Sequence, residues 1–247
     1  MKFHRTKLLI GDKAVQRLAD TRVILFGIGG VGSWCAEALI RSGVGHLTIV
    51  DNDVICVTNI NRQLQATTKN IGTLKVEALK ARLLEIHPEA EIAVLQKVYN
   101  QSARESFNLS GYDYVIDAID SLSHKVDLIA SAMDAGVTLF SAMGAACKLD
   151  ATTIRVDSIW KTHGCRLAKF VRRRLRHYGA TGDCLCVYSQ ERFSLFGDAP
   201  EPEESDTDDW SETKAQVNGS MVHMTGAFGF NLAGLVVQDV VTKSANS

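Results

Sequence analysis

A cluster of glycines between an apolar run and a helical pattern is the feature that most constrains this chain. Residues 23–40 read VILFGIGGVGSWCAEALI, in which Gly27, Gly29 and Gly32 match G-x-G-x-x-G. After a strand and before a helix, the first glycine permits a tight turn and the second lets a phosphate approach the backbone. The third lets the helix pack closely on the strand. Gly30 removes one more side chain, so the sequence predicts a nucleotide-phosphate site at this turn.

Apolar runs alternate with helical patterns through the first 150 residues. This alternation predicts a doubly wound α/β fold, a mainly parallel, Rossmann-like sheet with helices on both faces. The 247 residues allow one large domain, which we divide into a nucleotide-binding part at 1–160 and a smaller C-terminal part at 161–247. Strands are expected at 22–26, 46–50, 91–95, 112–117 and 137–143, and helices at 31–42, 73–86 and 123–135.

The C-terminal part is less regular. A basic helix is expected near 163–178, and the segment 197–212, with eight acids and two of the three prolines, predicts a solvated loop. Residues 221–241 are apolar and about as long as a membrane span. Polar residues such as His223 and Asp239 favour instead a helix buried against the sheet, with membrane contact as the less favoured alternative.

The cysteine spacing, the N-terminal sequence and the net charge argue against several classes of protein and of site. None of the six cysteines is spaced C-x-x-C, so we expect no structural zinc. Cys184 and Cys186 are expected in a strand, with their thiols on opposite faces. The start MKFHRTKLLIGDK lacks the apolar core of a secretory signal, which favours a reducing cytoplasm. A net charge of -1 excludes a global attraction to nucleic acid, so such binding would require a local patch.

An acid follows the second expected strand. Asp51 lies 19 residues after Gly32, where a carboxylate accepts hydrogen bonds from ribose hydroxyls. The glycine turn and this acid alone are typical of an enzyme that uses NAD or FAD. A nicotinamide oxidoreductase is therefore one alternative, which a comparison of NAD and ATP binding would separate.

The next residues favour ATP. Asn59, Arg62 and Gln63 follow, and Lys75 comes 13 residues after Arg62 at an expected helix start. Loop amides and a helix N-terminus can bind the two phosphates of a dinucleotide without further cations. A triphosphate attacked at its α-phosphate does need cations, because negative charge builds on the pyrophosphate as it leaves. Asp117 and Asp120 end a further strand, where carboxylates could hold a magnesium ion that bridges phosphates.

Four separated motifs, in the same order, resemble the ThiF/MoeB/HesA superfamily of adenylating enzymes, which is related to ubiquitin-activating enzymes. They are GIGGVGSW, VDNDVICVTNINRQ, GTLKVEAL and VIDAIDS, and the likeness runs from about residue 5 to 160. The resemblance implies that residues 1–160 form an ATP-binding adenylation domain. It implies ATP and Mg²⁺ as cofactors, a homodimer, and Arg5 reaching into the partner's site. The implied catalytic residues are Arg5, Arg62, Lys75 and Asp120, with Asp120 also the metal ligand, and the implied nucleotide-binding residues are Gly27, Gly29, Gly30, Gly32, Asp51, Asp53, Asn59 and Gln63.

Within this superfamily the chain is most similar to the branch of tRNA threonylcarbamoyladenosine dehydratases. That likeness implies adenylation of the carboxylate of this modified adenosine in tRNA, followed by intramolecular cyclisation. It also adds a cysteine-desulfurase or sulfur-acceptor system to the expected partners. GDCLCVYSQE resembles a cysteine-bearing segment of that branch, which makes Cys186 a candidate nucleophile. Activation of the C-terminal glycine of a ubiquitin-like or sulfur-carrier protein is the alternative, and a non-catalytic nucleotide-binding scaffold is a third.

A tRNA substrate requires a local basic surface. The expected helix at 163–178 supplies cations around an apolar stripe of helical spacing. A solvated helix face balanced by the acidic loop explains the same pattern about equally well, and the family likeness favours tRNA. The tRNA-binding candidates are Arg166, Lys169, Arg172, Arg173, Arg174 and Arg176.

Overall fold

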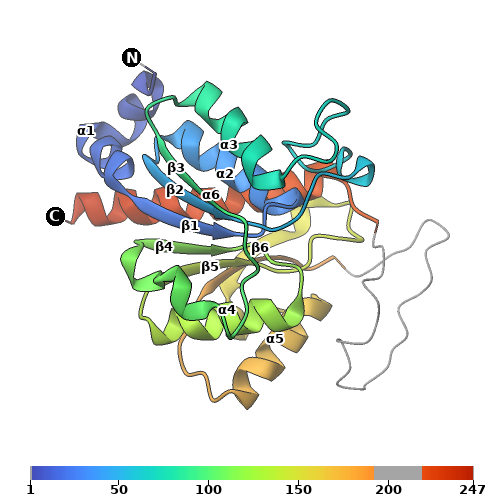
Figure 1. Cartoon of the computed structure of the whole chain (residues 1–247). Helices are drawn as coiled ribbons and strands as arrows, with labels where there is room; N and C mark the ends of the chain where they lie inside the picture. The colour runs from blue at the N-terminus through green and yellow to red at the C-terminus, as the bar shows by residue number, and fades with distance from the viewer. Residues whose placement is uncertain (1, 192–218, 247) are drawn as a thin grey trace.

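A seven-stranded sheet lies between two layers of helices, which confirms the expected doubly wound class (Figure 1). The computed structural model describes residues 2–191 and 219–246. The strand order is β3-β2-β1-β4-β5-β7-β6, and every pairing is parallel except that of β6 with β7. The strands are β1 (Arg22–Phe26), β2 (His46–Val50), β3 (Glu91–Leu95), β4 (Tyr114–Asp117), β5 (Thr138–Ala142), β6 (Ile154–Ser158) and β7 (Leu185–Ser189). The α-helices are α1 (His4–Asp20), α2 (Gly30–Ser42), α3 (Lys75–Ile86), α4 (Leu122–Asp134), α5 (Arg166–His177) and α6 (Val222–Ala245).

The central strands are buried on both faces, which explains why their sequences are continuous apolar runs. Four of the five residues of β1 and all four of β4 are buried. Helices α1, α2, α3 and α6 cover one face of the sheet, and α4 and α5 cover the other (Figure 1). Two apolar cores result, one on each side of the sheet.

Residues beyond 160 complete the same sheet. β7 lies between β5 and β6, and α6 packs on α1, α2, β5 and β7. The expected buried helix at 221–241 is confirmed as α6, which is long and apolar enough to cross a membrane by length and composition, but half of that stretch is buried in the protein. The acidic segment 197–212 lies outside the described residues.

The N-terminal helix α1 has no counterpart among the sequence-based predictions. It bends at Gly11, where φ is 81° and ψ is 167°, and it leads directly into the start of β1. The two residues just before it lie beside the connections that enter β2 and β3, since Lys2 pairs with Glu89 at 2.6 Å and Phe3 lies against Gly43. Helix α1 therefore occupies the edge of the sheet where the parallel strands begin.

The contact between α2 and α6 depends on a glycine. A Cβ atom at Gly229 would lie 2.5 Å from the carbonyl oxygen of Val31 and 2.8 Å from the amide nitrogen of Cys35. Both atoms belong to the α2 backbone, which cannot yield as a flexible side chain would. The close crossing holds α2 in place, and α2 begins at the glycine loop.

Gly229→Ala should therefore lower the free energy of unfolding by about 1–3 kcal/mol, because the methyl group separates α2 from α6. Gly234→Ala in the same helix is the matched control. A Cβ there meets no atom within 4 Å, so this change should raise the free energy of unfolding by up to about 1 kcal/mol through helix propensity. Urea unfolding followed by circular dichroism measures both, and equal stabilities for the two variants would contradict the packing argument.

Candidate active site

The strand order reverses next to β1, and the predicted site residues gather at that point. The chain continues from β1 to β2 and β3 on one side and resumes at β4 on the other side of β1. Ligands of doubly wound sheets bind at such a switch point, outside the carboxyl ends of the strands. The glycine loop follows β1, Asp51 follows β2, and Asp120 lies three residues after β4.

The loop glycines differ in what a side chain would meet. Gly27 has a φ of 87°, and a Cβ there would lie 2.6 Å from the carbonyl oxygen of Ala118. At Gly32 a Cβ would lie 1.8 Å from the Gly27 carbonyl oxygen. At Gly29, the residue before α2, a Cβ would meet nothing within 4 Å. The first and third glycines thus serve backbone packing, whereas Gly29 faces open space at a helix N-terminus, the place where an anion binds.

Asp51 ties β2 to the glycine loop. Its carboxylate accepts hydrogen bonds from the amides of Ile28, at 2.6 Å, and Asp53, at 2.8 Å. Burial raises the pKa of this carboxyl, and the two amides and Lys75 oppose that rise. The carboxylate is thus held beside the phosphate loop, as a ribose acceptor requires.

The connection between β2 and α3 folds back over the loop. A Cβ at Gly30 would lie 3.3 Å from Cγ of Arg62, so the arginine stem passes directly above the start of α2. The guanidinium donates to the Thr58 carbonyl oxygen at 2.9 Å and to Asn61 at 3.1 Å. Asn59 and Gln63 are buried beneath this segment, at 9% and 5% exposure. The structure therefore brings Arg62 to the glycine loop.

Three residues that the sequence reasoning missed fix this segment. Trp34 of α2 donates from Nε1 to the Arg62 carbonyl oxygen at 3.1 Å, and Ser33 accepts from the amide of Leu64 at 3.2 Å. Gln65 is 3% exposed and donates from Nε2 to the carbonyl oxygen of Ile28 in the loop at 2.9 Å. Gln65 stands two residues after Gln63 without any periodic pattern, so no sequence signal marked its role.

Lys75 begins α3 as predicted, and its ammonium is nearly buried. Nζ lies 2.7 Å from Oδ2 of Asp53, whose side chain is 59% exposed while that of Lys75 is 7% exposed. Asp53 also contacts Asp51, so the loop, the two acids and the lysine form one continuous set of contacts. This arrangement holds a cation at the edge of the phosphate site.

The structure gives the two acids after β4 different roles. Asp117, expected to share a magnesium ion, is fully buried and bonds instead to Lys125 at 2.7 Å and Ser141 at 2.6 Å. Its other oxygen accepts from the amide of Ile119 at 3.0 Å. A carboxylate engaged in this way shapes the turn and is not a metal ligand in this arrangement. Asp120 is exposed at the end of that turn.

No cluster of three or more metal-binding side chains (His, Cys, Asp or Glu) occurs among residues 2–191 and 219–246. Asp120 is an exposed carboxylate that a magnesium ion could share with nucleotide phosphates, an arrangement that this ion favours. The arginine expected to act in trans lies elsewhere. Arg5 is exposed on α1, at the edge where the strands begin, whereas the glycine loop lies at the opposite edge.

The two cysteines near β7 share one face, contrary to the expectation. Their Sγ atoms are 3.8 Å apart, because strand residues two positions apart point to the same side. Cys186 is fully buried, and burial with the neighbouring Cys184 raises its pKa well above the ordinary value. Such an environment disfavours the thiolate that a nucleophile requires.

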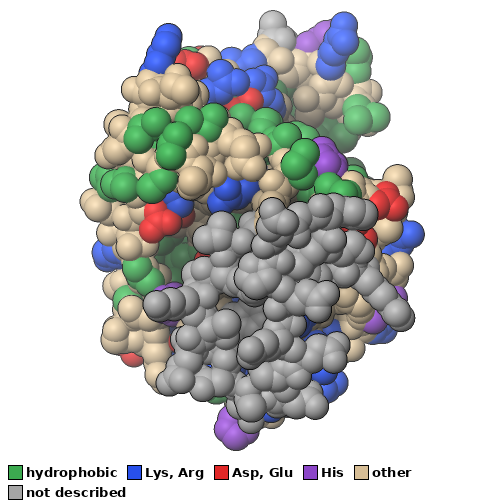
Figure 2. Space-filling view, turned by 90° about the vertical axis from the view of Figure 1, so that its right-hand side faces the viewer, with side chains coloured by type: hydrophobic (Ala, Val, Ile, Leu, Met, Phe, Trp, Pro, Cys, Tyr) green, Lys and Arg blue, Asp and Glu red, His purple; other side chains and the backbone are tan. Residues whose placement is uncertain are grey.

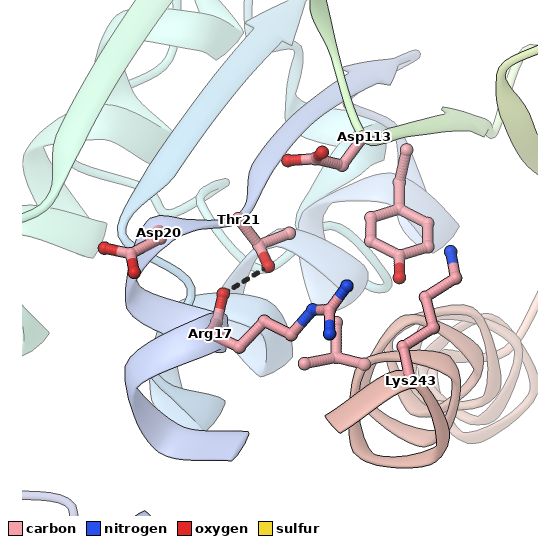
Figure 3. A pocket seen from close by; sticks show the side chains of 7 residues that line it. Arg17, Asp20, Thr21, Asp113 and Lys243 are labelled. Carbon is pink, nitrogen blue, oxygen red and sulfur yellow. Dashed lines mark hydrogen bonds between the residues drawn. The ribbon is translucent and has the colours of Figure 1, made fainter. Parts of the chain in front are cut away.

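The carboxyl edge has exposed apolar residues and cations, and Figure 2 views the molecule from this side. The β2–α3 connection contributes Val54, Val57 and Ile71, which are 45%, 65% and 47% exposed. At the opposite edge a cavity of about 260 Å³ lies between α1 and α6, lined by Arg17, Asp113 and Lys243 among others (Figure 3). Lys243 pairs there with Asp239 at 2.6 Å, and the cavity is remote from the glycine loop.

Comparisons with known proteins agree with this geometry. The model of the ThiF family matches residues 3–242. A tRNA threonylcarbamoyladenosine dehydratase of Bacillus subtilis (strain 168) is 41% identical over 190 residues, which are 77% of this chain and 75% of the relative. The protein of the same name from Escherichia coli (strain K12) is 41% identical over 175 residues, 71% of this chain and 65% of the relative.

Solved structures give the same result. E. coli TcdA, a tRNA N6-threonylcarbamoyladenosine dehydratase, was crystallised in complex with AMP and with ATP. Both structures are 34% identical to this chain, with TM-scores of 0.87 and 0.88, and cover 100% of this chain and 96% of the solved chain.

Gly29→Ala should weaken ATP binding by about tenfold or more, because the methyl group would enter the space where a phosphate meets the helix N-terminus. The fold should tolerate this change, with the free energy of unfolding within about 0.5 kcal/mol of the original. Gly32→Ala is the contrasting variant, since its methyl group would collide with the loop backbone and should destabilise the protein. Calorimetric titration with ATP and urea unfolding distinguish the two effects, and unchanged affinity in Gly29→Ala would contradict the assignment.

Proposed function

The chain belongs to the ThiF family, and we infer that it is an ATP-dependent tRNA threonylcarbamoyladenosine dehydratase. The observation that carries this conclusion is the continuous set of contacts from the glycine loop through Asp51 and Asp53 to Lys75, with Arg62 crossing the start of α2. These groups lie together at the strand switch, where a doubly wound sheet binds its ligand. Relatives named for the same reaction, one of them solved with ATP, support it.

In the first step the carboxylate of the modified adenosine attacks the α-phosphate of ATP, and pyrophosphate leaves. Amides at the start of α2, next to Gly29, orient the phosphates. Arg62 and Lys75 stabilise the charge that develops on the pyrophosphate. Lys75 exchanges its ion pair with Asp53 for the phosphate, which keeps the cation paired throughout.

Magnesium supplies further charge neutralisation when bound, and Asp120 is the residue that would hold it together with phosphate oxygens. The exposed carboxylate of Asp120 at the carboxyl end of β4 fits such a shared ion. Asp117 supports it indirectly, because its bonds to Lys125 and to the Ile119 amide fix the turn that carries Asp120.

In the second step a nucleophile of the same modified base attacks the acyl carbonyl, and AMP leaves. The ring closes rapidly because the nucleophile is already tethered to the reacting carbonyl. The nucleoside loses one water in total, while ATP is converted to AMP and pyrophosphate. This step needs no thiol nucleophile, which agrees with the buried position of Cys186.

Completion of the site by a second copy of the chain is part of the proposal. Arg5 lies at the edge of the sheet opposite its own glycine loop, so it can contribute to catalysis only in the site of a partner. Next to it on α1, Leu8 and Leu9 are 72% and 85% exposed, as expected for a surface covered in an assembly. A homodimer with two equivalent sites satisfies both observations.

Incubation with ATP, Mg²⁺ and tRNA that carries threonylcarbamoyladenosine should yield a nucleoside lighter by one water, detected by mass spectrometry after digestion. Lys75→Ala and Asp120→Ala should each slow the reaction by about a hundredfold or more, since the first removes a cation that stabilises the transition state and the second removes the carboxylate that would hold magnesium. Lys80→Ala, on the same helix as Lys75 but outside the site, is the control and should retain full activity. A wild-type protein that leaves the nucleoside intact would overturn the proposed function.

Mixing Arg5→Ala and Lys75→Ala proteins tests the shared site. Each variant alone should be nearly inactive, whereas in a heterodimer one of the two sites receives both intact residues. Random exchange of subunits should restore roughly a quarter of the wild-type rate. If the mixture stays as slow as the separate variants although subunits exchange, Arg5 does not act across a dimer.

A further inference from the structure

Helix α5 runs from the catalytic edge of the sheet to the opposite edge. Its first turn lies beside the end of β5, since a Cβ at Gly144 would be 3.6 Å from Sγ of Cys165. Beyond its last turn, Gly182 lies against Met133 at the end of α4. The outer surface of α5 therefore extends from the site described above along the α4 and α5 face of the molecule (Figure 1).

The cations of α5 are not equivalent. Arg166, Lys169, Arg173 and Arg176 are exposed and recur at intervals of three, four and three residues, which places them on one face of the helix. We call these four residues the α5 stripe. It is about 15 Å long at 1.5 Å per residue. The helix sequence RLAKFVRRRLRH contains no acid.

The other two arginines of the expected tRNA-binding set are partly buried. Arg172 turns inward to the hydroxyl of Thr162, and burial lowers its pKa. Arg174 is also half-buried. The structure thus narrows the six candidate cations to the four of the stripe.

The stripe ends at a cavity of about 280 Å³ between α4 and the turn that follows α5. Tyr178 stands at its rim with 59% of the residue exposed. The polar residues of its lining are Gln101, Arg104, Asp127, Ser131, Asp134 and Thr181, and Ala130, Met133 and Ala180 add apolar surface. The cavity therefore combines an exposed aromatic ring with hydrogen-bonding groups of both kinds.

The cavity wall is fixed in place. Trp160 donates from Nε1 to the Gly182 carbonyl oxygen at 2.9 Å, and its ring lies 5.7 Å from the guanidinium of Arg176 in the stripe. The Tyr178 hydroxyl donates to Asp127 across the cavity at 3.4 Å. Contacts from both α4 and the segment before α5 therefore hold the rim of the cavity in place.

We propose that the α5 stripe and the cavity at Tyr178 form one binding surface for the tRNA substrate, in which the stripe holds backbone phosphates and the cavity takes one unpaired base. A line of cations follows a phosphate backbone, and an exposed aromatic ring stacks on a base that is not paired. Asp127 accepts hydrogen bonds from base amino groups, and its charge disfavours a phosphate at the same place. The inference rests on the proposed function, since it concerns where that substrate lies.

Affinity for tRNA as a function of KCl concentration separates the two parts of this surface. The probe is unfractionated tRNA that carries threonylcarbamoyladenosine, in a filter-binding assay. Lys169→Ala/Arg173→Ala should weaken binding by about tenfold and reduce the slope of log affinity against log salt by about 1.5. Tyr178→Ala should weaken binding by about tenfold with an unchanged slope, and Tyr178→Phe should bind as the wild type does.

Lys13→Ala/Lys80→Ala removes the same charge from the opposite face and is the matched control, with expected wild-type affinity and slope. Every variant should bind ATP normally, which shows that the fold and the nucleotide site are intact. Wild-type tRNA affinity in either the stripe variant or Tyr178→Ala would overturn the inference, as would an equal loss in the control. The proposed function is judged separately, because only the dehydration assay on the wild-type protein decides it.

Discussion

The close approach of Gly32 to the Gly27 carbonyl oxygen is the constraint on which the rest of the site depends. No side chain fits between these two backbones, since a Cβ would lie 1.8 Å from the oxygen. The contact sets where α2 begins and aims its N-terminus at the carboxyl edge of the sheet. Trp34 and Ser33, on the first turns of α2, then hold the segment that carries Arg62. Phosphate binding and cation placement therefore follow from one piece of backbone packing.

Asp117 and Asp120 lie three residues apart at the end of β4, but their surroundings differ. Asp117 and Lys125 are both fully buried, and each would be strongly destabilising without the other. Their pairing, completed by Ser141 and the Ala142 carbonyl oxygen, gives the turn after β4 a rigid base. Asp120, three residues further along the chain, is exposed.

Much of the fold was predictable because buried parallel strands leave an unmistakable apolar pattern. The five expected strands, the start of α3 at Lys75 and the burial of α6 are confirmed. Helix α1 escaped prediction because it is mostly exposed and bends at Gly11, which weakens its periodicity. The roles of Gln65 and Asp117 depend on contacts between segments distant in sequence, which local patterns cannot reveal. The sequence also could not show which α5 cations are exposed and which are half-buried, because Arg172 turns inward to contact Thr162 only in the folded chain.

The ion pair between Lys75 and Asp53 has a consequence for the resting enzyme. The ammonium is nearly buried, while its carboxylate partner remains open to water. The protein thus carries its own counter-ion for Lys75, so this nearly buried ammonium is not left uncompensated. A phosphate that approaches Lys75 competes only with an exposed acid for a cation already in position, so its binding requires no rearrangement of the scaffold.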